Sequence, residues 1–492
     1  GNRSDRSDPH QMKDRERLVE ILAQKIRKQV HIRMIGDYDV DGVTSSHLFL
    51  TALRRVGAKV DVVIPHRIQD GYGLSLHLLQ QAKEDGVDTI LTCDNGIAAI
   101  DEIAWAKAQK MTVLVTDHHA VPFEEHEGRR TEKKSLADAV VNPHQQDCGY
   151  PYKELCGAGV AWNVIRVLYE NYDMDKREAE DLLDFVAMAT VCDVMSLTGE
   201  NRILVKEGLK RIRHTKNIGL QALMQACNVQ PENISAYHFG YVLGPCVNAT
   251  GRLDTARHAL RLFETGQETE AEEIARDLVD LNQERKELTL QGVEMAKKIC
   301  EEGGYENDPV LVLFLPDVHE SIAGLIAGRI REMYNRPVFV LTRGEEGVKG
   351  SGRSTENYSM YENMCGCAEL FTKFGGHPMA AGLSLPEENV EKFRRKINEN
   401  CPLTVEEVCP DIHIDMAMPV GYASTELVHQ FALLEPFGKD NPSPLFADRN
   451  LSISRMWLIG KNRNVLRMSV LSEYGQPVPV IFFGDVEPLF AY

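Results

Sequence analysis

The chain has 492 residues, of which 43% are hydrophobic and 26% charged, and its formal net charge at pH 7 is −18. One hydrophobic core cannot serve a chain of this length, so we expect about three domains. No apolar run approaches the roughly 18 residues that a membrane span needs, so no membrane partner is expected. The negative net charge argues against DNA binding over the whole surface, but it is compatible with a local basic groove.

The cysteines and the N-terminus bear on the cellular compartment. The 11 cysteines are scattered and form no Cys-x-x-Cys pair, so neither a disulfide framework nor a zinc site is indicated. The polar stretch Gly1–Asp8 contains no apolar signal core. We therefore expect a cytoplasmic protein.

The segment from Val30 to Pro143 alternates short β-branched runs with stretches of helical periodicity. This alternation predicts a parallel, doubly wound sheet and hence the α/β fold class. The predicted strands are Val30–Gly36, Lys59–Pro65, Asp88–Thr92, Met111–Thr116 and Ala139–Val141, and the predicted helices are Thr44–Val56, Leu74–Glu84 and Ala98–Lys110.

The rest of the chain changes pattern twice. Helices are predicted at Gly157–Tyr172 and within Ala179–Met195, the second ending at Asp193. A proline-free stretch from Thr269 to Glu302 predicts one long connecting helix. From about Ile412 the short strands of a small β domain follow. Between the long helix and these strands, a second, smaller α/β unit is predicted from Val310–Leu315, Ala323–Tyr334, Val338–Leu341 and a glycine-rich segment through Gly382. The predicted strands of the β domain are Leu451–Ile459, Val465–Leu471 and Val478–Phe483.

The run Asp37-Tyr38-Asp39-Val40-Asp41-Gly42 directly follows the first predicted strand. Three carboxylates this close repel one another unless a cation lies among them. Taken alone, such a run is more simply explained as an Asx-rich turn that ends a strand. An EF-hand loop is excluded, because the twelfth position of that loop requires glutamate and is Leu48 here.

Further polar residues follow later strands of the same predicted sheet. Asp94-Asn95-Gly96 comes after the third strand and Asp117-His118-His119 after the fourth. Ligands of open parallel sheets bind beyond the carboxyl ends of the strands, so we expect both groups to meet the aspartate run there. Oxygen and imidazole ligands suit Mn²⁺ or Mg²⁺. The pattern therefore predicts a metal site.

With these motifs in this order, the chain resembles the DHH phosphoesterases, which are named for a motif such as Asp117-His118-His119, and within them the RecJ family of single-strand-specific exonucleases. The resemblance extends from about Asp8 to Ala447. It also rests on Pro65-His66-Arg67, Val141-Asn142-Pro143-His144, Leu155-Cys156-Gly157-Ala158-Gly159, Cys192-Asp193-Val194-Met195, Asn248-Ala249-Thr250-Gly251-Arg252-Leu253, Gly350-Ser351-Gly352-Arg353-Ser354, Phe374-Gly375-Gly376-His377-Pro378 and Leu434-Glu435-Pro436-Phe437-Gly438.

The resemblance implies four parts. We expect a DHH catalytic domain at residues 1–265, a connecting helix at 266–302, a DHH-associated domain at 303–402 and an oligonucleotide-binding (OB) domain at 403–492. A complete OB barrel has five strands, whereas about three are predicted after Ala447. The C-terminal OB-like β-barrel is therefore expected to be incomplete.

The resemblance also implies a centre of two ions, Mn²⁺ or Mg²⁺, that activate water and absorb the charge that develops on the phosphate oxygens. The expected catalytic residues are Asp94, His118 and His119. His119 would contact the scissile phosphate and help to protonate the leaving 3′ oxygen, or it would orient the metal ligands instead. The expected ligands are Asp37, Asp39 and Asp94 around one ion and Asp41, Asp94, His118 and Asp193 around the other, so that Asp94 bridges the two.

A set of phosphate-binding residues follows from the same resemblance. Arginine forks match phosphate oxygens, and glycines allow the backbone to approach a nucleic-acid strand. Without the resemblance, such short motifs are better explained as tight turns beside a surface arginine. The residues expected to hold a terminal 5′-phosphate and the adjoining backbone are Arg67, Asn248, Arg252, Ser351, Arg353, Ser354 and His377.

The implied function is a 5′→3′ exonuclease that degrades single-stranded DNA with a free 5′ end to mononucleotides during recombination and repair. A monomer that works with a single-strand-binding protein and a helicase is expected. One alternative is a nanoRNase or cyclic-dinucleotide phosphodiesterase of the same superfamily, which the length of the chain disfavours. The other is an inactive DHH scaffold that binds replication proteins, which the complete ligand set disfavours.

Overall fold

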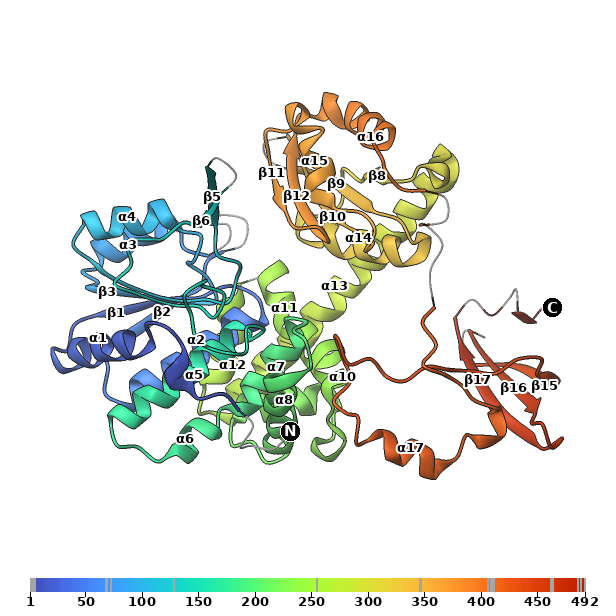
Figure 1. Ribbon diagram of the computed structural model, residues 1–492, viewed down its shortest axis with the longest axis horizontal. Helices are drawn as coiled ribbons and strands as arrows, with labels where there is room; N and C mark the ends of the chain where they lie inside the picture. Colours follow the sequence, from blue (N-terminus) through green and yellow to red (C-terminus); the bar gives the residue numbers. More distant parts are fainter. Residues whose placement is uncertain are drawn as a thin grey trace. The chain divides into compact units, whose positions relative to one another are not determined.

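The computed structural model describes residues 6–66, 70, 73–126, 129–253, 255–344, 347–404, 407, 412–460, 464–484, 486 and 489–490 (Figure 1). The chain forms two compact units, residues 1–410 and 411–492. The finer division of the first unit at residues 265 and 302 remains a prediction. None of the helices within the described ranges combines the length and the apolar character that crossing a membrane demands.

The first sheet of the larger unit is parallel throughout, as the sequence predicted. Its strand order is β2-β1-β3-β4-β7, so the order reverses between β1 and β3. Each neighbouring pair is in parallel register, for example Ile35 opposite Thr92. The strands are β1 (Ile32–Ile35), β2 (Val60–Val63), β3 (Thr89–Cys93), β4 (Thr112–Thr116) and β7 (Ala139–Val141), and a separate hairpin joins β5 (Phe123–His126) to β6 (Arg129–Glu132).

Helices cover both faces of this sheet (Figure 1). Because side chains alternate between the two faces along each strand, one strand can contribute to two cores. Ile32 and Met34 belong to one core, and Ile35 belongs to the other. The first core includes α1 (Arg15–Arg27), α2 (Val40–Arg55) and α5 (Gly157–Asn171), and the second includes α3 (Leu76–Glu84) and α4 (Ile100–Ala108). The doubly wound α/β arrangement is confirmed.

A helical layer extends the first core. The single helix predicted from Ala179 is wrong, because the chain forms two helices with a turn at residues 181–182. Its predicted end at Asp193 agrees with the structure, in which the second helix ends at Cys192 with Asp193 as its cap. The helices of the layer are α6 (Lys176–Glu180), α7 (Leu183–Cys192), α8 (Gly199–Ile212), α9 (Ile218–Ala226), α10 (Ala236–His238), α11 (Gly244–Leu253) and α12 (Ala256–Glu264), with a π-helical turn at Phe239–Leu243.

Asp184, at the start of α7, is a buried acid that makes stability depend on pH. It is 3% exposed, and its carboxylate accepts hydrogen bonds from the Phe185 amide (2.8 Å) and the Thr215 hydroxyl (2.7 Å). Burial raises the pKa of Asp184 from 3.8 to about 6. Since the unfolded chain ionises this group more readily, its contribution to stability is complete below about pH 4 and is lost as the pH rises through 6.

Replacing Asp184 by asparagine is therefore expected to increase stability at pH 8 by on the order of 2–3 kcal/mol and to change it little at pH 4, because the amide has no charge to bury. Urea unfolding of both proteins at the two pH values measures this. Parallel pH dependences of wild type and variant would contradict it.

The long connecting helix is present as α13 (Glu268–Gly303), which confirms the helix predicted over Thr269–Glu302. It ends where Gly304 adopts a left-handed conformation with φ of 66°, which glycine tolerates without a steric cost. Ala271, Ile274 and Leu278 near its start belong to the first core, whereas Val293 and Ala296 pack into the core of the following α/β unit. One continuous helix thus contributes to both cores.

The second α/β unit contains a mixed sheet of order β11-β12-β10-β9-β8, in which β8 and β9 are parallel and the other pairs antiparallel. The glycine-rich segment forms three of its strands. Its elements are β8 (Leu311–Phe314), α14 (Glu320–Tyr334), β9 (Val338–Gly344), β10 (Gly347–Arg353), α15 (Met360–Cys365), β11 (Lys373–Gly376), β12 (Ala380–Leu385) and α16 (Val390–Glu399).

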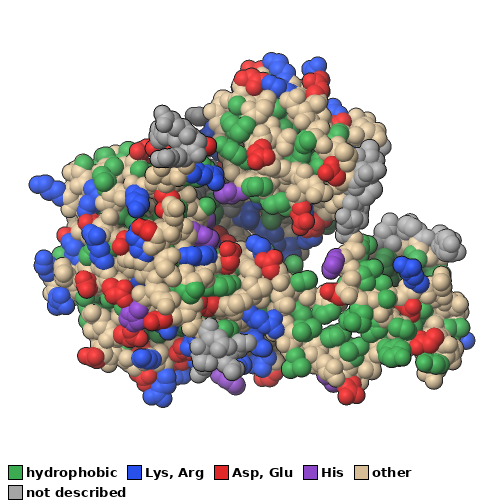
Figure 2. Space-filling view, viewed as in Figure 1, with side chains coloured by type: hydrophobic (Ala, Val, Ile, Leu, Met, Phe, Trp, Pro, Cys, Tyr) green, Lys and Arg blue, Asp and Glu red, His purple; other side chains and the backbone are tan. Residues whose placement is uncertain are grey.

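The C-terminal unit is built from short strands, as predicted. Its described residues hold an antiparallel sheet of order β15-β16-β17 and a parallel pair, β13 and β14, which agrees with the three strands expected from the sequence. Hydrophobic side chains gather on the face of this unit that Figure 2 shows, and Tyr474 and Phe483 are 76% and 73% exposed. The elements are β13 (Met416–Ala417), α17 (Thr425–Phe431), β14 (Phe446–Ala447), β15 (Ser452–Ile459), β16 (Val465–Leu471) and β17 (Pro477–Phe483).

Candidate functional site

The predicted metal ligands surround the point where the strand order reverses. Asp37 follows β1 and Asp94 follows β3, and these two strands are neighbours in the sheet. The Asn95 amide fixes the two strand ends to each other, because its Nδ2 donates to the carbonyls of Ile35 (3.0 Å), Gly36 (3.1 Å) and Cys93 (3.0 Å). Such a switch point is where open parallel sheets bind ligands.

The first group of candidate ligands consists of three carboxylates. Asp37, Asp39 and Asp94 each offer an oxygen, and these oxygens lie within 4.8 Å of one another. Asp39 caps the N-terminus of α2 and accepts a hydrogen bond from the Gly42 amide at 2.9 Å. The turn that the sequence suggested for this run is therefore real, and it also brings the carboxylates together.

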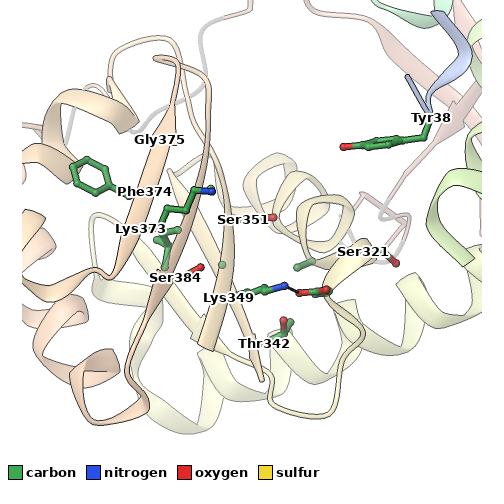
Figure 3. A pocket seen from close by; sticks show the side chains of 14 residues that line it. Tyr38, Ser321, Thr342, Lys349, Ser351, Lys373, Phe374, Gly375 and Ser384 are labelled. Atoms are coloured by element: carbon green, nitrogen blue, oxygen red, sulfur yellow. Dashed lines mark ion pairs between the residues drawn. The ribbon is translucent and has the colours of Figure 1, made fainter. Parts of the chain in front are cut away.

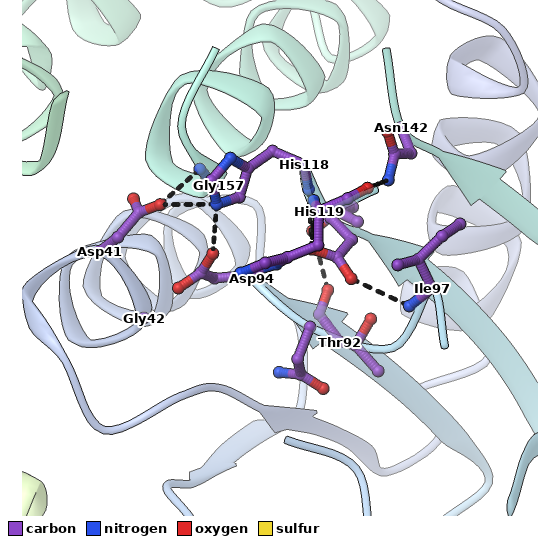
Figure 4. A network of polar contacts seen from close by, with 12 residues as sticks. Asp41, Gly42, Thr92, Asp94, Ile97, His118, His119, Asn142 and Gly157 are labelled. Atoms are coloured by element: carbon purple, nitrogen blue, oxygen red, sulfur yellow. Dashed lines mark hydrogen bonds and ion pairs between the residues drawn. The ribbon is translucent and has the colours of Figure 1, made fainter. Parts of the chain in front are cut away.

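The second group surrounds His118 (Figure 4). The His118 Nε2 lies 3.1 Å from an Asp94 oxygen, 3.5 Å from Asp193 and 3.6 Å from Asp41. All four residues expected around the second ion thus meet at one imidazole nitrogen. Asp94 takes part in both groups, as a bridging residue must.

The N-terminus of α5 holds the Asp41 carboxylate. Its two carboxylate oxygens accept hydrogen bonds from the amides of Gly157 (2.6 Å) and Ala158 (2.8 Å), where the helix dipole favours negative charge. Gly157 also packs against Asp94, since a Cβ at this position would lie 2.7 Å from the Asp94 side chain. The N-terminus of α5 therefore supports two candidate ligands at once.

Asp117, which the sequence grouped with His118 and His119 at the predicted metal site, positions the histidine pair. Its carboxylate accepts hydrogen bonds from the amides of Ile97, His118 and His119 and lies 2.7 Å from the His119 Nδ1. Burial alone would lower the pKa of His119, but Asp117 outweighs this and raises that pKa to about 9. His119 also offers a ring nitrogen within 4.8 Å of ligand atoms of Asp94 and His118.

The chemistry of these donors fits divalent cations. Burial, followed by the charges of Asp41 and Asp39, raises the pKa of Asp94 well above its ordinary value, and burial and Asp41 raise that of Asp39. A cation among the carboxylates would remove this repulsion. A set dominated by oxygen with one or two imidazoles suits Mn²⁺ or Mg²⁺.

A separate pocket of about 430 Å³ lies along the glycine-rich strands (Figure 3). Tyr38, from the loop that carries Asp37 and Asp39, extends toward it. Lys349 lines the pocket and pairs with Glu320 at 2.8 Å, and Lys373 also lines it. The sequence reasoning missed all of these residues, although both lysines directly adjoin the glycine motifs that carried the resemblance.

Some of the predicted phosphate-binding residues lie in or beside this pocket. Ser351 lines it. Arg252 lies beside the start of α14, where its Nη1 donates to the Ser321 carbonyl at 2.6 Å. Arg353 donates to its neighbour Gly352 (2.7 Å), and its guanidinium packs over Gly324 of α14. Both arginines therefore approach the first turns of the same helix.

The other residues of that set are placed differently. Ser354 is 1% exposed and its hydroxyl donates to the Tyr358 carbonyl at 2.5 Å, so it orders the turn after β10 and offers no surface to a ligand. This contradicts the direct contact expected from the sequence. Asn248 accepts from the Val40 amide at 3.1 Å and so supports the aspartate loop. His377 is exposed in the turn between β11 and β12, and Arg67 lies outside the described residues.

Comparison with known proteins identifies three matching segments. Residues 31–190 match the DHH family, N-terminal domain, residues 307–401 match the DHHA1 domain and residues 414–491 match the RecJ OB domain. Among curated proteins, the single-stranded-DNA-specific exonuclease RecJ of Haemophilus influenzae is 35% identical, with 95% of this chain and 83% of that protein covered. The RecJ exonuclease of Bacillus subtilis is 33% identical, with 95% and 58% covered.

A solved structure agrees with these relatives. The RecJ of Thermus thermophilus in complex with Mn²⁺ superposes with a TM-score of 0.80 at 28% identity, covering 96% of this chain and 66% of that one, and the same protein has been solved with Mg²⁺. The chain thus spans less than two thirds of the length of the B. subtilis and T. thermophilus proteins. The resemblance seen in the motifs is confirmed: this chain belongs to the RecJ family of DHH proteins.

Proposed function

We propose that the protein is a metal-dependent exonuclease that degrades single-stranded DNA in the 5′→3′ direction and releases mononucleotides. One observation carries the proposal: Tyr38 lines the pocket along the glycine-rich strands and lies in sequence between Asp37 and Asp39 of the candidate metal centre. A strand whose terminal phosphate binds in the pocket would therefore lie close to the carboxylate cluster.

Two divalent cations, Mn²⁺ or Mg²⁺, would activate water and stabilise the charge on the phosphate. One ion would be held by Asp37, Asp39 and Asp94, and the other by Asp41, Asp94, His118 and Asp193. His119 would contact the scissile phosphate and donate a proton to the leaving 3′ oxygen. Asp117 keeps its ring in place for that step.

Phosphate recognition would fall to the side chains around the first turn of α14. Lys349 and Arg353 from β10, together with Arg252, supply positive charge there, and the α14 N-terminus adds the positive end of its dipole. Ser351 would donate a hydrogen bond. We further propose that the protein acts in the cytoplasm as a monomer, in recombination and repair, beside a helicase and a single-strand-binding protein.

The polarity is tested with single strands blocked at either end and incubated with Mn²⁺. A strand blocked at the 5′ end should resist degradation, and one blocked at the 3′ end should be shortened. Equal degradation of the two substrates would overturn the proposed direction. Cleavage of dinucleotides without cleavage of a longer strand would instead indicate a nanoRNase or cyclic-dinucleotide phosphodiesterase.

Replacing Lys349 by alanine is expected to weaken binding of a 5′-phosphorylated strand about tenfold, since one charge-assisted contact is lost. Glu320→Gln should have the opposite sign, because it removes the carboxylate that opposes an incoming phosphate. Fluorescence anisotropy with 5′-phosphate and 5′-hydroxyl strands measures both changes.

Arg343→Ala serves as the matched control for Lys349→Ala. Arg343 lies on the neighbouring strand β9 and pairs with Glu387 outside the pocket. Its removal should leave affinity unchanged. Equal losses in the two variants would show that general surface charge, and not the pocket, binds the strand.

A further inference from the structure

A second cavity, of about 790 Å³, opens in the helical layer among α2, α7, α8, α9 and the end of α12. It shares α2 and α7 with the metal centre but lies toward their other ends. His47 follows Asp41 by six residues and Asp184 precedes Asp193 by nine, which corresponds to roughly 9 and 14 Å along the helix axes. The mechanism proposed above uses none of its lining residues.

The floor of this cavity is aromatic. His47 is 6% exposed, and its ring centroid lies 4.4 Å from that of Phe185 and 5.8 Å from that of Phe263. All three side chains line the cavity. A flat aromatic ring system would find matching ring surfaces here.

His47 also carries hydrogen-bonding capacity that the described part of the protein leaves unused. Neither ring nitrogen makes a hydrogen bond to any described residue, and Nδ1 is fully buried. Burial and then the charge of Arg54 lower the pKa of His47 to about 3, so the ring is neutral and presents one donor and one acceptor. Nδ1 is closed off from the cavity, whereas Nε2 keeps accessible surface and is the ring nitrogen that a ligand in the cavity can reach.

Hydrogen bonds fix the walls of the cavity. The Asn217 side chain donates to the Phe263 carbonyl (2.8 Å) and accepts from the Leu220 amide (2.9 Å), and so ties the start of α9 to the end of α12. The Thr215 hydroxyl donates to Asp184 on α7. These bonds connect α7, α9 and α12, which all contribute to the lining.

Basic and acidic side chains are balanced around the cavity, and one lysine is left without an acidic partner among the described residues. Arg54, Lys210 and Arg211 are paired with Glu264, Glu207 and Asp181. Lys216 is exposed and, within the described ranges, has no carboxylate at ion-pair distance, and His214 stands beside it. Lys216 also precedes the N-terminus of α9, whose dipole favours an anion.

We propose that this cavity is a second, non-catalytic site that binds a nucleoside monophosphate, with the base on the aromatic floor and the phosphate at Lys216. A donor or an acceptor on the nucleobase edge can pair with Nε2 of the neutral His47 ring. The phosphate meets the Lys216 ammonium group at the rim.

Photolabelling of the full chain with 8-azidoadenosine 5′-monophosphate, in EDTA so that the result does not depend on nuclease activity, tests this site. Label is expected on residues that line the cavity, and unlabelled AMP should compete for it at least tenfold better than adenosine. Label confined to other parts of the chain would overturn the site, and equal competition by adenosine would overturn the phosphate assignment.

Variants locate the contacts. Lys216→Ala, at the exposed rim, is expected to lower AMP affinity about tenfold without a change in melting temperature, and His47→Phe to abolish labelling of the cavity. Lys298→Ala, an exposed lysine on α13, is the matched control and should have no effect. Wild-type affinity in Lys216→Ala and wild-type labelling in His47→Phe would each overturn the proposal.

Discussion

Replacing Asp94 by asparagine is expected to reduce nuclease activity at least about a thousandfold, because Asp94 is the one carboxylate shared by both candidate ligand groups. The amide keeps the size of the side chain but removes the charge that would hold two cations. Steady-state rates on a 5′-phosphorylated single strand measure the loss, and calorimetric titration with Mn²⁺ should show fewer bound ions.

The same substitution should stabilise the metal-free protein. Burial and the neighbouring carboxylates make the ionised Asp94 unfavourable, so the neutral amide removes repulsion that the cations otherwise offset. A higher melting temperature in EDTA, together with a smaller increase on adding Mn²⁺, is expected. A general loss of folding would give the opposite sign in EDTA.

Asp88→Asn provides the matched control. Asp88 lies just before the start of β3, at the opposite end of the strand from Asp94, and forms a part-buried pair with Lys25 at 2.5 Å. Since Asp88 is not among the candidate ligands, activity and Mn²⁺ binding should stay near wild type. Wild-type activity in Asp94→Asn would contradict the bridging role, and equal losses in both variants would show that charge on β3 matters irrespective of position.

The parallel sheet and the long helix could be predicted because their evidence is local. Buried β-branched runs alternate with helical periods from Val30 to Pro143, and α13 carries its pattern without interruption. The turn that separates α6 from α7 could not be predicted, because Asp181 and Leu182 are not strong helix breakers. Its position depends on the packing of the helical layer, which is a tertiary effect.

The candidate site shows the same limit. Carboxyl ends of parallel strands meet at one edge, so the meeting of Asp37 with Asp94 could be predicted from the alternation of strands and helices. The pocket residues did not follow from it. Tyr38 and Lys349 come together only through the packing of α11, α13 and α14. Ser354 and Ser351 belong to one short motif, yet the chain buries the first and exposes the second to the pocket, which only backbone geometry decides.

Gly157→Ala is expected to lower activity at least about a hundredfold, although alanine is the better helix former. The new Cβ would lie 2.7 Å from both Cβ and Oδ1 of Asp94, a separation that real structures do not accommodate. Asp94 is buried at a positive φ of 63°, so it has little freedom to retreat. A displacement of about 1 Å at a reacting centre is enough for a loss of this size.

Gly159→Ala separates the clash from a general effect of adding a methyl group to α5. A Cβ at Gly159 meets Leu155 at 3.4 Å, which is ordinary contact, so this variant should keep its activity and melt at or slightly above the wild-type temperature. Rates and melting curves of both variants with saturating Mn²⁺ measure the difference. If Gly157→Ala were as active as Gly159→Ala, the close packing of α5 against Asp94 would not be what positions the bridging carboxylate.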